Sequence, residues 1–415
     1  MAEAVGATTA GSQRGHGARA VALVSGAHFA NHFQNMVLPP LFPLLTAQLG
    51  VGFVELGFAL TLANLASVAA QLPVGSLVDR FGARRTLVIA LLVSAVALVG
   101  VGLAPNYPNL LLASAVLGLA DSVFHPADYA MLSARIAPKR LGRAFSIHTF
   151  SGFLGTAVAP VTMLAIAAFA GLGPALIAAG VLGVVAAVPL LAAPGIDSSA
   201  TPGHAVASDV AIPGMSAILT PTVLFLTGFF ALLALSGTGI SNFSVGALTA
   251  AFGTPLSAAN VALTAYLGAQ ALGVLAGGLI ADRTRRHSEV AALGFGINAG
   301  IVLLIGTVGF SPVPLAVAMA GAGLLGGLIM PSRDMLVRAA APPGAVGRTF
   351  GIVTGGFNIA GVVGPLMFGY ILDHGAPQWV FGASVIIMLL TTAVALIGDR
   401  GIAASRRRAA TASAD

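Results

Sequence analysis

Apolar runs long enough to cross a lipid bilayer fill most of this chain, and the polar breaks between them are short. A helix of about 20 apolar residues spans a hydrocarbon core of about 30 Å. Of the 415 residues, 57% are hydrophobic and only 8% are charged, so the chain cannot cover itself with polar surface. The short alternating segments typical of membrane β-barrels are absent from the sequence. The sequence therefore predicts an all-α integral membrane protein.

Twelve apolar runs can be separated at polar or Gly/Pro-containing breaks. The expected spans are residues 20–47, 54–78, 86–104, 108–134, 143–168, 173–193, 219–249, 257–281, 289–309, 313–337, 348–371 and 378–398. A long polar stretch at 194–217 divides them six and six, and we expect it to be a flexible cytoplasmic linker. The expected domains are a cytoplasmic tail at 1–19, six-helix bundles at 20–193 and 218–399, and a second cytoplasmic tail at 400–415.

Several residues of the first six spans recur in the last six at a constant distance. Pro126, Gly142, Arg143, Phe145 and Pro160 are repeated 205 positions later as Pro331, Gly347, Arg348, Phe350 and Pro365. The sequence therefore predicts two pseudo-symmetric six-helix bundles. Such a plan is typical of transporters whose site lies between the two halves.

The basic residues indicate which side of the membrane each loop faces. If both termini are cytoplasmic, all 19 Lys and Arg lie on the cytoplasmic side, as the positive-inside rule requires. This distribution accounts for the net charge of +6 without a nucleic-acid partner. The first 19 residues are polar and have no apolar core, so we expect no signal peptide there, and the absence of cysteine excludes disulfides and thiol-ligated metals. We expect a multi-pass protein of the cell inner (cytoplasmic) membrane.

Two loops carry a family resemblance. GSLVDRFGARRTL, from Gly75 to Leu87, resembles the signature loop of the major facilitator superfamily: Gly, an apolar residue, Asp-Arg, Gly and paired basic residues. GGLIADRTRRH, between the eighth and ninth spans, resembles a weaker second copy in which Arg285 replaces the Gly. Within the superfamily, SGAHFANHFQNMVLPPLFPLL and FHPAD are similar to the fosmidomycin-resistance group of exporters. One departure is Ser114, which stands about where many proton antiporters of the superfamily carry Arg.

The resemblance implies that these loops form contacts between helices that break as the protein changes state. Gly82 permits a tight turn, and Asp79 can accept charge-assisted hydrogen bonds at a helix end. A simpler interpretation is that the arginines only anchor the loop in the cytoplasm. The candidate latch residues are Gly75, Asp79, Arg80, Gly82, Arg84, Arg85, Gly278, Asp282 and Arg283.

Polar stripes run along two of the expected spans. Asp121, His125 and Asp128 have the spacing i, i+4, i+7, which places them on one helix face. The first span has a similar stripe of His28, Asn31, His32 and Asn35. Counting along the spans puts the stripes at matching depths, and the resemblance implies that spans 1, 4, 7 and 10 line a central cavity.

A proton pathway is the function we predict for these stripes. A charge at the bilayer centre costs about 2.5–3.5 kcal/mol on insertion scales, so Asp121 is expected to be protonated, paired or hydrated. We predict that Asp121 binds and releases a proton and that His125 relays it toward the cytoplasm. Pro126 removes a backbone hydrogen bond there and gives the helix a place to bend.

Other interpretations of the stripes are structural or metal-based. A pair such as Asp121 with His32 would satisfy the carboxyl group without any function. His148 in the fifth span is either a core residue or part of the pathway. A His/Asp metal site would suit zinc or iron. Because Asn31 and Asn35 dilute that ligand set, we expect no metal and no other cofactor.

The second half has fewer polar candidates. Asn242 follows the helix-loosening segment SGTGIS, and Asn358 lies in the eleventh span. Arg333 and its neighbour Asp334 lie in the tenth span, and Arg333 stands 205 positions after Asp128. Arg333 could pair with Asp128, receive an anionic substrate, or only extend toward the membrane surface.

These features favour a secondary transporter that moves a small polar or anionic compound, with proton coupling and export of a toxic compound as the leading hypothesis. An uptake facilitator or symporter for a metabolite such as a carboxylate is the alternative, and a non-transporting sensor is a third. We find no nucleotide-binding loop and no nucleophile–base set, so neither ATP nor an enzymatic reaction is expected. The expected partners are substrate, protons and membrane lipid, and the protein is expected to be a monomer.

Overall fold

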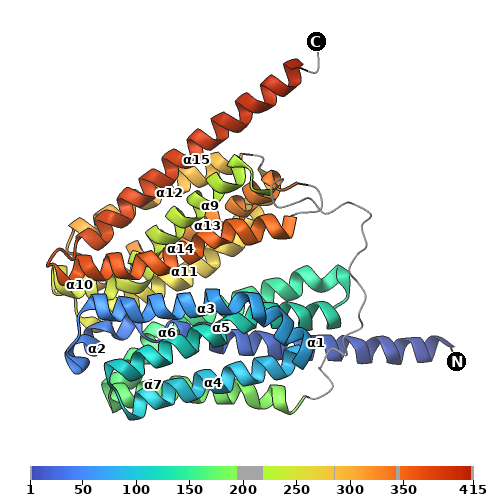
Figure 1. The fold of residues 1–415 in the computed structure, drawn as a ribbon, viewed down its shortest axis with the longest axis horizontal. Helices are drawn as coiled ribbons and strands as arrows, with labels where there is room; N and C mark the ends of the chain where they lie inside the picture. Colours follow the sequence, from blue (N-terminus) through green and yellow to red (C-terminus); the bar gives the residue numbers. More distant parts are fainter. Residues whose placement is uncertain (1, 194–217, 285, 343–345, 413–415) are drawn as a thin grey trace. The chain divides into compact units, whose positions relative to one another are not determined.

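The computed structural model describes residues 2–193, 218–284, 286–342 and 346–412, and its regular elements there are all helical (Figure 1). The elements before the linker are α1 (Ala2–Asn35), η1 (Pro39–Leu41), α2 (Phe42–Leu49), α3 (Phe53–Phe81), α4 (Ala83–Leu103), α5 (Tyr107–Arg135), α6 (Pro138–Ala170) and α7 (Leu172–Leu191). Those after it are α9 (Pro221–Thr238), η3 (Gly239–Phe243), α10 (Ser244–Phe252), α11 (Leu256–Arg283), α12 (His287–Thr307), α13 (Pro312–Ala340), α14 (Val346–Asp373) and α15 (Trp379–Ala412). Eleven stretches of these described helices are long and apolar enough to cross a membrane, which confirms the all-α membrane fold.

The chain forms two compact units. One contains residues 1–51 and 59–205, and the other contains residues 52–58 and 206–415. In the first unit α1 packs on α6 and α4 packs on α7; in the second, α9 packs on α14 and α12 packs on α15. The same pairs of helices therefore meet in each unit, as a duplicated six-helix bundle requires.

Helix bounds follow the repeat seen in the sequence. α5 runs from Tyr107 to Arg135 and α13 from Pro312 to Ala340, so both ends are displaced by 205 positions (312 − 107 and 340 − 135). The equivalent of α2, which ends at Leu49, is α10, which ends at Phe252, a displacement of 203 (252 − 49). The duplication thus determines where helices begin and end.

The first expected span, 20–47, is wrong as a single helix. α1 ends at Asn35, and η1 and α2 follow with Pro39 and Pro40 at the start of η1. Proline has no backbone N–H and its ring collides with the preceding turn, so an α-helix cannot continue through this pair. Helix α2 ends at Gly50, which caps its C-terminus in the left-handed conformation with φ of 66°.

The seventh expected span is also interrupted, but without proline. Between α9 and α10, residues Gly239–Phe243 form one π-helical turn, η3. In the first half, α1 ends at Asn35. With the displacement of 203, the equivalent position in the second half is 238 (35 + 203), where α9 ends and after which the π-turn begins. The sequence SGTGIS had suggested a loosened helix here, and the π-turn is its structural form.

The expected linker at 194–217 lies outside the described residues. α1 begins at Ala2 and α15 ends at Ala412, so both expected tails continue the helix beside them. The domain boundaries at 193 and 218 stay predictions.

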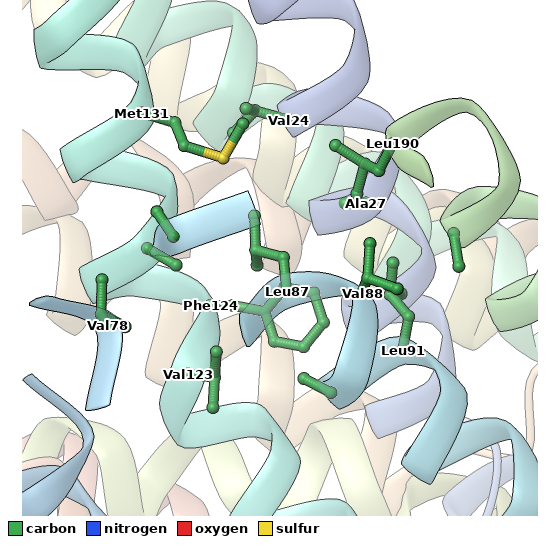
Figure 2. Close-up of a cluster of buried hydrophobic side chains, with 14 of the residues drawn as sticks. Val24, Ala27, Val78, Leu87, Val88, Leu91, Val123, Phe124, Met131 and Leu190 are labelled. Carbon is green, nitrogen blue, oxygen red and sulfur yellow. The ribbon is translucent and has the colours of Figure 1, made fainter. Parts of the chain in front are cut away.

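A cluster of buried apolar side chains fixes the rotation of α5 in the first unit (Figure 2). Val123, Phe124 and Met131 of α5 turn toward side chains of α1 and α4, including Val24 and Leu87. Membrane helices are held together by such close packing, because lipid is as apolar as leucine. Because this packing fixes the rotation of α5, the polar side chains of α5 between Phe124 and Met131 keep a fixed orientation toward α1 and α6.

Candidate functional site

The polar stripes of α1 and α5 meet inside the first unit, together with a third helix, α6. The side chains form two separate groups, one around Asp121 and one around Asp128. His28, Asn31 and Asp128 are buried, and His125 and Asn35 are exposed. The sequence predicted that the two stripes face each other, but it did not separate these two groups.

Asp121 is held by hydrogen bonds from three neutral side chains. The Nδ2 atoms of Asn31 and Asn35 both donate to Oδ1 of Asp121, at 2.9 Å and 2.7 Å. Ser67 of α3 donates to the other carboxyl oxygen at 3.4 Å. These donors can serve a charged or a neutral carboxyl group, because a protonated carboxyl keeps acceptor capacity.

Among the described residues, no hydrogen bond or ion pair joins Asp121 to His32, so the structural pairing of these two residues stays a prediction. Nδ1 of His32 instead lies 3.2 Å from the hydroxyl oxygen of Thr156 on α6. The two asparagines both donate to Oδ1 of Asp121, while His32 contacts α6.

Asp128 is the centre of the second group. Its Oδ2 atom lies 3.2 Å from Nδ1 of His28 and 3.5 Å from Nε2 of His148. Asp128 is fully buried (0% exposed), and both imidazoles are almost completely buried. A buried carboxylate needs a charged or hydrogen-bonding partner. His148 therefore lies in the polar cluster as a buried residue, and its role in a pathway stays a prediction.

The histidine rings lie close together in tilted and edge-on arrangements. The ring centroid of His28 lies 3.8 Å from that of His148, 4.4 Å from that of His32 and 5.2 Å from that of His125. His125 contacts His28, His32 and Tyr129, whereas the hydrogen bonds of Asp121 go to α1 and α3. The relay from Asp121 to His125 therefore has no direct contact in this structure and stays a prediction.

In the second unit, Arg333 is enclosed by aromatic rings. Its guanidinium carbon lies 4.6 Å from the ring centre of Phe230 and 5.1 Å from that of Phe357. Its Nε donates to Oδ1 of Asp334 at 2.9 Å. A guanidinium stacks well on aromatic faces and keeps its remaining N–H groups free to bind an anion. With 8% exposure, Arg333 is not a side chain that only extends to the surface.

The other two candidates of the second unit are less well defined. Asn242 lies in the π-turn η3 and is half-buried. Asn358 follows Phe357 on α14 and is also half-buried. Their roles in a pathway stay predictions.

The candidate latch residues lie at the ends of helices. Gly82 joins α3 to α4 with φ of 86°, a conformation that favours glycine, and this confirms the tight turn. Arg84 donates to the carbonyl oxygen of Leu190 at 3.1 Å and so satisfies the end of α7. Asp79 is exposed at the end of α3, as are the second-copy residues Asp282 and Arg283 at the end of α11. The latch role itself stays a prediction.

Sequence reasoning missed four side chains of these sites. Ser67 and Thr156 each bind a predicted residue, and Phe230 and Phe357 enclose Arg333. Thr156 could have been found, because it follows His148 by eight residues and so lies two turns along the same face of the helix. Serine and phenylalanine are too common in membrane helices for the others to stand out.

Comparisons with known proteins agree with this architecture. The family model of the Major Facilitator Superfamily matches residues 24–244 and 229–413. The fosmidomycin resistance protein of Escherichia coli (strain K12) is 25% identical over 376 residues, 88% of this chain and 89% of that protein. The tetracenomycin C resistance and export protein of Streptomyces glaucescens is 28% identical over 134 residues, 32% of this chain and 24% of that protein.

A solved structure shows the same fold. The inward-facing, unoccupied crystal structure of a bacterial homologue of the human lysosomal transporter Spinster matches with a TM-score of 0.77. The match covers 93% of this chain and 97% of that one at 14% identity. The family match, the duplicated six-helix units and the signature loops lead to one conclusion: this chain is a multi-pass secondary transporter that belongs to the major facilitator superfamily.

Proposed function

We propose that this transporter exports a small polar or anionic compound in exchange for protons, and that Asp121 carries the proton. The observation behind the proposal is the set of three neutral donors around the Asp121 carboxyl group. A carboxyl group without a fixed positive partner can change its charge when its exposure to water changes. Alternating access would produce that change, because each conformation opens the site to a different side of the membrane.

Two relatives support the direction of transport. The names of the proteins from Escherichia coli and Streptomyces glaucescens refer to resistance, and the second also to export. We propose that the chain acts as a monomer in the cytoplasmic membrane with both termini in the cytoplasm, and that it catalyses no chemical reaction. Fosmidomycin is therefore the first compound to test, followed by a panel of organic anions and drugs in a thermal-shift screen of the detergent-purified protein.

The test of coupling uses Asp121→Asn in proteoliposomes. The amide oxygen of asparagine can still accept from Asn31 and Asn35, so the local fold should survive. We expect transport driven by a pH gradient to be lost, while exchange of labelled compound at equal pH on both sides continues near the wild-type rate. Glu289→Gln is the matched control, since the Glu289 side chain is 56% exposed and pairs with exposed Arg286.

Proton movement gives the decisive readout. Adding substrate to wild-type vesicles should change the internal pH, and the Asp121→Asn vesicles should show no such change. If the variant moves protons with substrate as the wild type does, Asp121 is not the coupling group. If neither form moves protons while both transport substrate, the protein is an uncoupled facilitator.

A further inference from the structure

We propose that His28, His125, His148 and Asp128 form a binding site for a divalent transition-metal ion of the Zn²⁺ class. The three histidines come from three helices, α1, α5 and α6, and each offers a ring nitrogen within 4.8 Å of the other two. Three imidazoles with one carboxylate are a ligand set that zinc accepts. This site does not depend on proton coupling at Asp121.

The distances around Asp128 fit a tetrahedral ion. Zn–N bonds of about 2.0–2.1 Å place neighbouring ligand atoms of a tetrahedron about 3.3 Å apart. Oδ2 of Asp128 lies 3.2 Å from Nδ1 of His28 and 3.5 Å from Nε2 of His148. Oδ2 of Asp128 therefore lies at a ligand-to-ligand distance from two of the three imidazoles.

The ligand atoms are buried and lack hydrogen bonds. Nδ1 of His28, both ring nitrogens of His148 and both carboxyl oxygens of Asp128 form no aligned hydrogen bond, although Asp128 lies at ion-pair distance from both rings. Buried polar groups normally have one, and an exception calls for an explanation such as an ion. A divalent cation would satisfy these lone pairs together and would neutralise the buried carboxylate. His125 is the exposed member of this ligand set.

The sequence argument against a metal does not hold in the structure. Asn31 and Asn35 lie on the same stripe as His28 and were expected to dilute the ligands. Both asparagines instead donate to Asp121 and leave the Asp128 group with imidazoles and a carboxylate. Because the chain has no cysteine, no thiolate elsewhere competes for a soft metal.

Metal binding can be measured without transport. The full chain is purified in detergent through a tag that contains no histidine, treated with a chelator, and titrated with Zn²⁺ by calorimetry and with Co²⁺ by visible absorption. We expect one equivalent of Zn²⁺ to bind, Co²⁺ to give the absorption of a four-coordinate nitrogen and oxygen site, and Zn²⁺ to abolish that absorption. Excess Mg²⁺ should not compete, because it prefers oxygen ligands.

Substitutions then locate the site. His125→Gln is the main variant, because His125 is the exposed member of the ligand set, whereas His28 and His148 are buried. Outer-sphere partners alone change metal affinity by about 10–100-fold, so loss of a direct ligand should weaken Zn²⁺ binding at least about tenfold. Asp128→Asn, which keeps the side-chain shape, should weaken it to a similar extent. His374→Gln is the control, since that histidine is exposed and contacts the carbonyl oxygen of Tyr370.

Two results would overturn the site. Zn²⁺ binding that is unsaturable, or equal in wild type, His125→Gln and Asp128→Asn, would show that the cluster binds no metal. Binding that is lost in His374→Gln would place the ion on the protein surface. Neither result would bear on proton coupling, which is measured with Asp121→Asn.

Discussion

A Cβ atom added to Gly152 would lie 2.7 Å from both Cδ2 and Nε2 of the His28 ring. The absence of a side chain on this turn of α6 is therefore what lets the imidazole occupy its place. Any larger residue must displace the ring and, with it, the contact to Asp128.

Gly152→Ala should consequently destabilise the protein. Overpacking of this kind costs about 1–3 kcal/mol. Gly142→Ala, on the same helix with no atom within 4 Å of the added Cβ, should be neutral or stabilising because alanine favours helix. Thermal unfolding of both variants in detergent checks this. Equal melting temperatures for the two would mean that His28 has room to move.

The aromatic enclosure of Arg333 leads to a second prediction. Arg333→Lys keeps the positive charge but loses planar stacking on Phe230 and Phe357, which is worth about 0.5–2 kcal/mol. If Arg333 receives an anionic substrate, the lysine variant should retain part of the transport rate and Arg333→Ala should lose stabilisation by ligand. A thermal-shift titration and a transport assay measure the two effects.

Arg286→Ala is the control for lost charge, because the Arg286 side chain is 77% exposed. If Arg333 acts only in closing one side of the transporter, Arg333→Ala should still bind ligand while the balance between inward- and outward-open states shifts. Normal binding together with normal transport in Arg333→Ala would contradict both roles.

Asp373 leads to a third prediction, about the start of α3. Its two carboxyl oxygens accept hydrogen bonds from the backbone N–H groups of Phe53 and Val54, at 2.8 Å and 2.7 Å. Loss of such a cap costs about 0.5–2 kcal/mol. Asp373→Ala should therefore destabilise the protein, and Asp373→Asn should do so less because one oxygen acceptor remains.

Hydrogen exchange at the amides of Phe53 and Val54 provides the local measurement for this cap. Exchange should become faster in Asp373→Ala, while amides in the middle of α3 should keep their wild-type rates. Unchanged protection at both amides would show that water replaces the carboxylate without cost.

The fourth prediction is the topology. Since the chain has no cysteine, single replacements can be labelled without background. A cysteine at Thr284, just after α11, should react with an impermeant reagent only from the cytoplasm, and one at His374 only from outside. Labelling of Thr284→Cys from outside would reverse the orientation.

Some of the site could be predicted because it depends on helix periodicity. The spacing of Asp121, His125 and Asp128 placed them on one face of α5, and the structure keeps them facing the stripe of α1. Periodicity gives a residue's face but not its partner. Whether Asn31 or His32 meets Asp121 depends on the relative rotation of α1 and α5, which the packing of Phe124 and its neighbours determines.

The breaks in the first span of each half show the same limit. Pro39 and Pro40 were visible in the sequence, yet apolar character alone joined 20–47 into one span. Hydropathy measures whether residues can lie in lipid, not whether their backbone can form one continuous helix. At Gly239 the glycine-rich sequence suggested a weak helix, but nothing in it specified a π-turn rather than a bend.

The π-turn η3 also accommodates one residue more than a regular turn does. Its hydrogen bonds join residues five apart rather than four, so the extra residue of Gly239–Phe243 is taken up within that turn and the helix on either side keeps nearly the same phase. Removing one residue there to restore a regular α-helix would therefore leave the face of α10 that packs on α11, with Val245 and Leu248 buried, turned the same way. The turn confines an insertion to five residues, and a one-residue deletion there should be tolerated better than the same deletion inside α10, which would rotate the rest of that helix by about 100°.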